Sequence, residues 1–217
     1  MTESKAMILG CYGKSLSREE VRFYRGEAPW GFILFARNIS EAEQIKDLVA
    51  EMRDSVGRPD APVFIDQEGG RVQRIRPPLA PNYPAGAALG ALWQQDHDAG
   101  ERAVWLLARL HAFDLSRYGI TADCLPVLDV PIEGASDVIG SRAYGKKPEI
   151  VTAMGRAAAD GLMSGGVLEG REVNIVKAEI SGKGTFWRVR VPANSRNEAI
   201  SLCESYKAAG GNCFVSR

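Results

Sequence analysis

A ten-residue segment from 65 to 74 gathers chemically active side chains in this 217-residue chain. It reads Ile-Asp-Gln-Glu-Gly-Gly-Arg-Val-Gln-Arg, with two carboxylates, two amides and two guanidinium groups around a pair of glycines. A carboxylate beside guanidinium groups stays ionised and can accept hydrogen bonds from two hydroxyls, which is what a sugar ring presents. The segment therefore predicts sugar or polyol binding through Asp66. The alternative is a surface loop in which Asp66 caps the next turn.

Motifs for other kinds of chemistry are absent from the sequence. It has no metal-ligand spacing, no glycine loop followed by Lys-Ser/Thr for phosphate binding, and no Gly-x-Ser-x-Gly. His97 and His111 lie in helical sequence without a matching partner, so we expect them to face solvent or to pack in the fold. The sequence predicts neither a metal site nor a cofactor.

The composition is that of an ordinary globular protein. The chain has 27 basic and 27 acidic residues, and 45% of its residues are hydrophobic. Zero net charge leaves no basic excess to neutralise phosphates, so we expect no nucleic-acid partner. The longest apolar runs fall short of the roughly 18 residues that span a bilayer, and the N-terminus lacks the basic start and apolar core of a signal peptide. We expect no membrane partner and a cytoplasmic location.

Charge and cysteine are distributed unevenly along the chain. Residues 1–167 carry 19 basic and 22 acidic side chains, whereas residues 168–217 carry 8 and 5. Cys11 and Cys124 lie far apart, but Cys203 and Cys213 lie ten residues apart near the end. These shifts indicate two parts of different origin.

The first part must form the elements that position the 65–74 segment. Apolar runs predict strands at 6–9, 31–35, 63–65 and 120–125, and helical patterns follow at 17–25, from 40, at 100–118 and at 148–164. Capping boxes begin the helices at Ser17 and Ser40. Four strand-helix units in series favour an α/β fold with a parallel sheet and right-handed crossovers. Asp66 follows the third strand, and functional groups collect at such carboxyl ends.

The last fifty residues follow a different pattern. Segments 173–180 and 186–191 are rich in β-formers and flank Ser-Gly-Lys-Gly at 181–184, which predicts a hairpin. A helix capped at Ser195 and a closing strand at 213–215 complete a small α+β unit of β-β-α-β order.

Four segments resemble, in the same order, the N-terminal half of the family 3 glycoside hydrolases of the β-N-acetylhexosaminidase type. They are 31–38 (Gly-Phe-Ile-Leu-Phe-Ala-Arg-Asn), 65–74, 126–130 (Pro-Val-Leu-Asp-Val) and 139–145 (Ile-Gly-Ser-Arg-Ala-Tyr-Gly). The resemblance covers residues 6–167 and implies a partial TIM-type (β/α)8 barrel of about four to five βα units. It also implies that Asp66, Arg74 and Arg142 hold the N-acetylglucosamine at the non-reducing end. The family's activity is hydrolysis of terminal β-N-acetylglucosamine in peptidoglycan recycling.

Three further polar residues near these motifs are expected to have structural roles. Asp129 resembles a structural carboxylate at a strand end rather than a catalytic one. Glu68 and Arg71 are expected to order the glycine loop rather than to touch a substrate.

The family pattern ends at Leu168. In the resembled enzymes a Lys-His-Phe-Pro-Gly-His-Gly motif, a mobile loop with the acid/base Asp and His, and the nucleophilic Asp follow at this point. Residues 168–217 instead contain no Asp and no His, so they supply neither nucleophile nor acid/base histidine. A retaining glycosidase needs both groups. We therefore predict no catalytic residue and an isolated chain that is inactive.

The tail resembles the second half of a SPOR domain, a module that binds peptidoglycan strands. The resemblance rests on 186–192, 195–209 and 210–215. It implies that Trp187, Arg188 and Arg190 contact a glycan, whereas the alternative places Trp187 on the core face and the arginines in water. Cys203 and Cys213 are candidates for a disulfide, but without a signal peptide we favour free thiols.

We therefore interpret the chain as half of a glycoside hydrolase barrel (1–167) joined to a SPOR-like fragment (168–217). Its expected partners are N-acetylglucosamine-containing saccharides and peptidoglycan strands. The alternatives are a non-catalytic glycan-binding protein and a non-functional gene fusion. An unclosed half barrel exposes strand edges, which predicts low stability or self-association.

Overall fold

The structure is a computed structural model that describes residues 4–134, 136–165, 174–180, 184–190, 193–208 and 215. Four parallel strands form its main sheet, in the order β1-β2-β3-β6. Their bounds are Lys5–Leu9, Pro29–Leu34, Val63–Ile65 and Ala122–Asp123. Phe32 pairs with Val63 and Phe64 pairs with Ala122, so the carboxyl ends of β2, β3 and β6 meet at one edge. The predicted α/β class and parallel sheet are confirmed.

Helices α1 (Arg18–Glu27) and α2 (Ala42–Val56) connect the first three strands and begin differently from each other. Ser17 accepts a hydrogen bond from the Glu20 amide, and the Glu20 carboxylate accepts one from the Ser17 amide, as predicted. The capping box predicted at Ser40 is wrong. The Ser40 amide and hydroxyl both donate to Gln44, so α2 begins at Ala42 without a side-chain cap.

The first core cluster lies between the sheet and the helices α1 and α2. Phe32 and Leu34 of β2 meet Ile45 and Met52 of α2, and each of these side chains has 0% exposure. Burying a side chain of this size stabilises the fold by roughly 1.5–3 kcal/mol. Trp30, near the start of β2, is 45% exposed and contacts the Phe64 ring.

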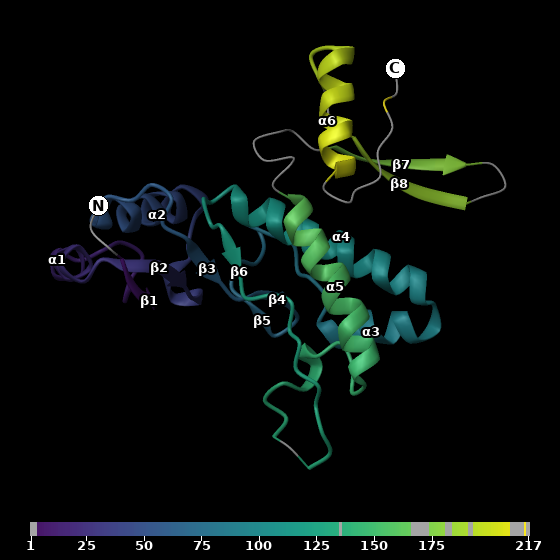
Figure 1. The fold of residues 1–217 in the computed structure, drawn as a ribbon, viewed down its shortest axis with the longest axis horizontal. Helices are drawn as coiled ribbons and strands as arrows, with labels where there is room; N and C mark the ends of the chain where they lie inside the picture. Colours follow the sequence, from purple (N-terminus) through teal and green to yellow (C-terminus); the bar gives the residue numbers. More distant parts are fainter. Residues whose placement is uncertain are drawn as a thin grey trace.

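A second cluster is built by three helices, α3 (Gly86–Gln95), α4 (His97–Ser116) and α5 (Pro148–Gly165), which lie together beside the sheet in Figure 1. The sequence predicted a single helix at 100–118 and missed α3. Glycine permits the close approach of α5 to α4. A Cβ on Gly161 would lie 2.3 Å from the Trp105 carbonyl oxygen, so the helices meet where side chains are absent.

Short elements surround the sheet's carboxyl edge. They are η1 (Ala36–Asn38), β4 (Gln67–Gly69), β5 (Val72–Gln73) and η2 (Gly140–Arg142). The fourth strand is also shorter than predicted, because β6 covers only two residues of the expected 120–125.

The tail contains the antiparallel hairpin β7 (Asn174–Ile180) and β8 (Gly184–Arg190), followed by α6 (Arg196–Ala208). The predicted hairpin and helix are confirmed, and the Ser195 hydroxyl caps the helix by accepting from the Glu198 amide. The predicted closing strand falls on residues that, apart from Val215, lie outside the described ranges. Among the described helices, none combines the length and apolar content needed to span a bilayer.

Candidate functional site

The 65–74 segment forms a tight hairpin at the carboxyl end of β3, made by the antiparallel strands β4 and β5. Gly69 and Gly70 turn the chain with φ values of 95° and 58°. A Cβ on Gly69 would lie 2.3 Å from the Pro84 carbonyl oxygen. The turn therefore requires glycine both for its backbone angle and for its close approach to the following loop.

The side chain of Gln67 holds this hairpin together from within. It has 0% exposure, its Oε1 accepts from the amides of Arg74 and Ile75, and its Nε2 donates to the Ile75 carbonyl. Sequence reasoning gave Gln67 no role. Its internal hydrogen bonds fix the distance between the two ends of the segment, which bear Asp66 and Arg74.

Asp66 and Arg74 come together as an ion pair. Arg74 Nη2 donates to Asp66 Oδ2 at 2.7 Å, and the two side chains are 26% and 23% exposed. This partial exposure leaves both charged groups within reach of a solute while the pair keeps each one oriented. Of the predicted sugar-binding residues, the structure thus brings these two into direct contact.

Arg142 approaches the same site from η2. Its Nε and Nη2 donate to the two carboxylate oxygens of Glu68 at 2.8 and 2.6 Å. The Glu68 side chain is only 5% exposed, whereas that of Arg142 is 25% exposed. The hydrogen bonds to Glu68 raise the pKa of Arg142. Such bidentate pairs fix the plane of the guanidinium group, so Glu68 orients Arg142.

Arg71 links the hairpin to the segment before η2 by donating to the Val138 carbonyl oxygen. The expected ordering role of Arg71 fits this contact. Asp129, which was expected to be structural, is exposed.

A second layer of polar groups lies beneath the hairpin and was missed from the sequence. Asp123, at the end of β6, accepts a hydrogen bond from the Gln67 amide at 3.0 Å through Oδ1. Burial, together with smaller contributions from the nearby carboxylates Glu68 and Asp66, raises the pKa of Asp123 to about 8. Asp123 follows a strand at the same sheet edge as Asp66, so the strand-end rule that singled out Asp66 would also have found it.

The two histidines differ in environment. His97 is exposed and stacks on Trp93 with ring centroids 3.8 Å apart. His111 has 0% exposure. Its ring meets the Tyr83 ring edge-on, with 4.5 Å between the ring centroids, and its Nδ1 lies 3.9 Å from Asp123 Oδ2. Burial lowers the pKa of His111 to about 4. In the part of the chain that is described, no cluster of three or more His, Cys, Asp or Glu residues is arranged to hold a metal ion.

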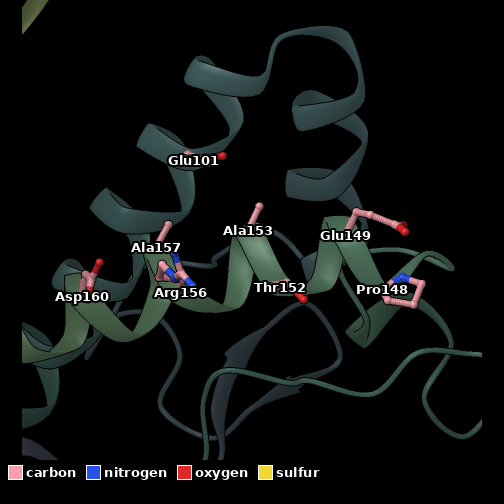
Figure 2. A pocket seen from close by; sticks show the side chains of 8 residues that line it. All are labelled: Glu101, Pro148, Glu149, Thr152, Ala153, Arg156, Ala157 and Asp160. Carbon is pink, nitrogen blue, oxygen red and sulfur yellow. The ribbon is translucent and has the colours of Figure 1, made fainter.

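A hollow of about 530 Å³ lies on another part of the molecule, between α4 and α5 (Figure 2). Glu101 of α4 faces it, and the remaining lining residues belong to α5, among them Glu149, Arg156 and Asp160. None of the predicted sugar-binding residues lines this hollow. The site of Asp66, Arg74 and Arg142 is thus separate from this hollow, and Arg142 with Glu68 instead lines a small pocket beside Leu89 and Tyr144.

The predicted tail residues are placed only by their backbone. In β8, Trp187 pairs with Lys177, Arg188 with Val176 and Arg190 with Asn174. Glycan binding by these residues stays a prediction.

The cysteines of the tail are only partly described. Cys203 is disulfide-bonded, which differs from the free thiol that we favoured. Cys213 lies outside the described residues, so the pairing of these two cysteines is not tested.

Comparison with family models gives two matches. Residues 17–171 match the glycosyl hydrolase family 3 N terminal domain, and residues 156–217 match the SPOR domain. Both resemblances noted in the sequence are thereby confirmed. The two matched ranges overlap at 156–171, which includes the predicted junction at 167 and 168.

Known proteins are similar to the first part of the chain. A β-hexosaminidase of Methylococcus capsulatus is 41% identical over 155 residues, which is 71% of this chain and 44% of that protein. A β-hexosaminidase of Aromatoleum aromaticum is 33% identical over 161 residues, or 74% of this chain and 45% of that protein. The chain therefore spans less than half the length of these curated relatives.

Solved structures agree with the sequence relatives. NagZ from Neisseria gonorrhoeae in complex with N-trifluoroacetyl-D-glucosamine superposes with a TM-score of 0.70 at 35% identity, covering 75% of this chain and 48% of that chain. A family 3 β-N-acetylglucosaminidase from Paenibacillus gives a TM-score of 0.62 at 29% identity, covering 73% of this chain and 30% of that chain. The fold described above is thus part of a TIM-type barrel.

Proposed function

Because the chain belongs to glycosyl hydrolase family 3, we propose that it binds terminal N-acetylglucosamine of cell-wall saccharides through Asp66, Arg74 and Arg142. The observation that carries the proposal is the partly exposed Asp66–Arg74 pair at the carboxyl end of β3. A similar structure, that of the gonococcal NagZ, contains an N-acylated glucosamine, which supports this class of ligand.

The geometry suits recognition of a sugar ring. The Asp66 carboxylate can accept hydrogen bonds from adjacent hydroxyls, and the Arg74 guanidinium that donates to it holds its orientation. Arg142 uses its Nε and one Nη2 hydrogen for Glu68, so the remaining donors of its five can face a ligand. Fixed donors and acceptors of opposite charge then select the orientation of the ring.

The proposed role is recognition without bond cleavage. A retaining glycosidase needs a nucleophilic carboxylate and a proton donor on opposite sides of the anomeric carbon. Residues 168–217 contain neither Asp nor His, and the carboxylates at the site described above are paired or buried. The chain alone therefore offers no nucleophile and proton donor that could carry out hydrolysis.

Titration with N-acetylglucosamine, followed by calorimetry or saturation-transfer NMR, tests the proposal. We expect weak binding by the native chain and a loss of about 10- to 100-fold in Asp66→Asn, the size of a lost charge-assisted hydrogen bond. Asp98→Asn is the matched control, because Asp98 is an exposed carboxylate on α4. Equal affinity of the Asp66→Asn variant and the native chain would contradict the proposal.

A chromogenic β-N-acetylglucosaminide separates binding from hydrolysis. We expect no turnover by the purified chain. Turnover that disappears in Asp66→Asn would show that the chain is a hydrolase after all.

The tail favours a second glycan-binding surface, because residues 156–217 match the SPOR domain. The proposed contacts are Trp187, Arg188 and Arg190 of β8. Sedimentation with purified peptidoglycan sacculi tests them. Retention of the native chain should fall in the Arg188→Ala/Arg190→Ala variant, and equal retention of both would count against this surface.

We also propose self-association through the open edges of the sheet. The strands β1 and β6 each have one neighbour in the described four-stranded sheet.

A further inference from the structure

The site has an unusual support, a buried acid and imidazole that face each other beneath the hairpin. His111 Nδ1 of α4 lies 3.9 Å from Asp123 Oδ2 of β6, and the side chains are 0% and 2% exposed. Within the described residues, neither His111 ring nitrogen nor Asp123 Oδ2 has a hydrogen-bond partner. Buried polar atoms are nearly always paired, so this arrangement calls for a reason.

The other oxygen of Asp123 has a specific partner in the sugar site. Oδ1 accepts from the backbone amide of Gln67, the residue that follows Asp66. The Cys124 amide, next to Asp123, donates to the Ile65 carbonyl on the other side of Asp66. The backbone on both sides of Asp66 is thus held by the end of β6.

The charges around Asp123 oppose its ionisation. Asp66 and Glu68 on the hairpin are acidic, the Cys124 thiol is its chain neighbour, and the Tyr144 hydroxyl is close enough to sense its charge. The two cations of the site, Arg74 and Arg142, are already paired with Asp66 and Glu68. On the α4 side Asp123 meets His111, whose burial disfavours the imidazolium form.

We propose that Asp123 is a positioning residue for Asp66. Asp123 is protonated and uncharged, accepts a hydrogen bond from the Gln67 amide, and lies against a neutral His111. In this form the carbonyl oxygen accepts from Gln67, and the hydroxyl hydrogen points toward the His111 nitrogen. Loss of that proton would place a third carboxylate beside Asp66 and Glu68, which would displace the hairpin. The inference rests on the proposed sugar site, and it predicts that sugar affinity falls when Asp123 ionises.

NMR on the native chain tests the coupling without any variant and without sugar. The Asp123 carboxyl carbon and the Gln67 amide should titrate together with one alkaline midpoint, and the His111 ring nitrogens should keep neutral shifts throughout. A Gln67 amide that does not respond while Asp123 ionises, or an Asp123 already ionised at neutral pH, would overturn the inference.

Sugar titrations then test the consequence. Affinity for N-acetylglucosamine should fall by about 5-fold or more between pH 6.5 and 9 in the native chain. Asp123→Ala should weaken binding by about 10-fold at pH 6.5, because the Gln67 amide loses its acceptor. Asp123→Asn should restore most of that affinity and remove the alkaline fall, whereas Asp98→Asn should behave as the native chain.

The two failures are distinguishable. If the Gln67 amide follows Asp123 but no sugar binds at any pH, the positioning contact stands and the proposed function fails. If sugar binds equally well to Asp123→Ala and the native chain at both pH values, the proposed function stands and the inference fails. A circular-dichroism melt of each variant identifies a loss of folding, and the titration of the native chain still decides the inference in that case.

Discussion

Asp123 and His111 are buried titratable groups whose pKa values are displaced in opposite directions. Burial raises the pKa of Asp123 from 3.8 to about 8 and lowers that of His111 from 6.5 to about 4. Between pH 4 and 6.5, Asp123 is protonated only in the folded chain and His111 is protonated only in the unfolded chain. The two groups therefore change the free energy of unfolding in opposite directions as pH rises, and their effects cancel. From pH 6.5 to 8 only the folded chain holds an extra proton, and stability falls as pH rises.

We expect this residue-scale effect to lower the free energy of unfolding by roughly 2 kcal/mol between pH 6.5 and 8 in the native chain relative to Asp123→Asn. As pH rises from 4 to 6.5, the free energy of unfolding of Asp123→Asn should increase while that of the native chain stays constant. In the variant only His111 then differs in protonation between the folded and unfolded chains. Urea unfolding at pH 5, 6.5 and 8 measures both slopes, with Asp98→Asn as the control. Parallel pH profiles of the native chain and Asp123→Asn would contradict the displaced pKa values.

Single residues of the site were predictable when the chemistry and the neighbours lay in one short segment. Asp66 and Arg74 are eight positions apart in one hairpin, so the composition of 65–74 already placed Asp66 near guanidinium groups, and the family resemblance singled out Arg74. Glu68 and Arg142 are 74 positions apart, and only the family resemblance pointed to Arg142. The contact between His111 and Asp123 depends on how α4 packs beside β6, which no local pattern contains.

At the scale of elements, the packing of α5 on α4 depends on Gly161. Its substitution by alanine would add a Cβ at 2.3 Å from the Trp105 carbonyl oxygen and 3.1 Å from the Ala108 side chain. We expect Gly161→Ala to destabilise the fold by about 1–3 kcal/mol, since overpacking outweighs the better helix propensity of alanine. Gly26 of α1 is the matched control, because a Cβ there meets nothing within 4 Å.

Gly26→Ala should leave stability unchanged or raise it by up to about 1 kcal/mol. Thermal unfolding of both variants checks the pair, and similar melting temperatures would show that α4 and α5 can separate without cost.

Elements with strong local signals, such as the Ser17 cap of α1, were predicted correctly. Helix α3 was missed, because its apolar run follows a Gly/Pro-rich loop. The capping box predicted for α2 does not form, because the Ser40 amide and hydroxyl donate to Gln44.

At the scale of the whole molecule, the four-stranded parallel sheet has features that favour association. Parallel sheets are almost always covered on both faces, but Ile8, which pairs with Gly31 on the face opposite Phe32, is 42% exposed. The edge strand β1 pairs only with β2 in the described sheet. Exposed apolar edge strands pair with other chains unless charge or proline blocks them.

The native chain should therefore elute with a mass above its 23.6 kDa in size-exclusion chromatography with light scattering, and the excess should grow with concentration. Ile8→Lys should shift the distribution toward the monomer, because a lysine on an edge strand opposes pairing. Phe23→Lys is the control, because Phe23 is a 54% exposed apolar side chain on helix α1 and not on a strand. A native chain that stays monomeric at all concentrations and melts sharply and reversibly would show that the sheet face and edge are already satisfied within one molecule.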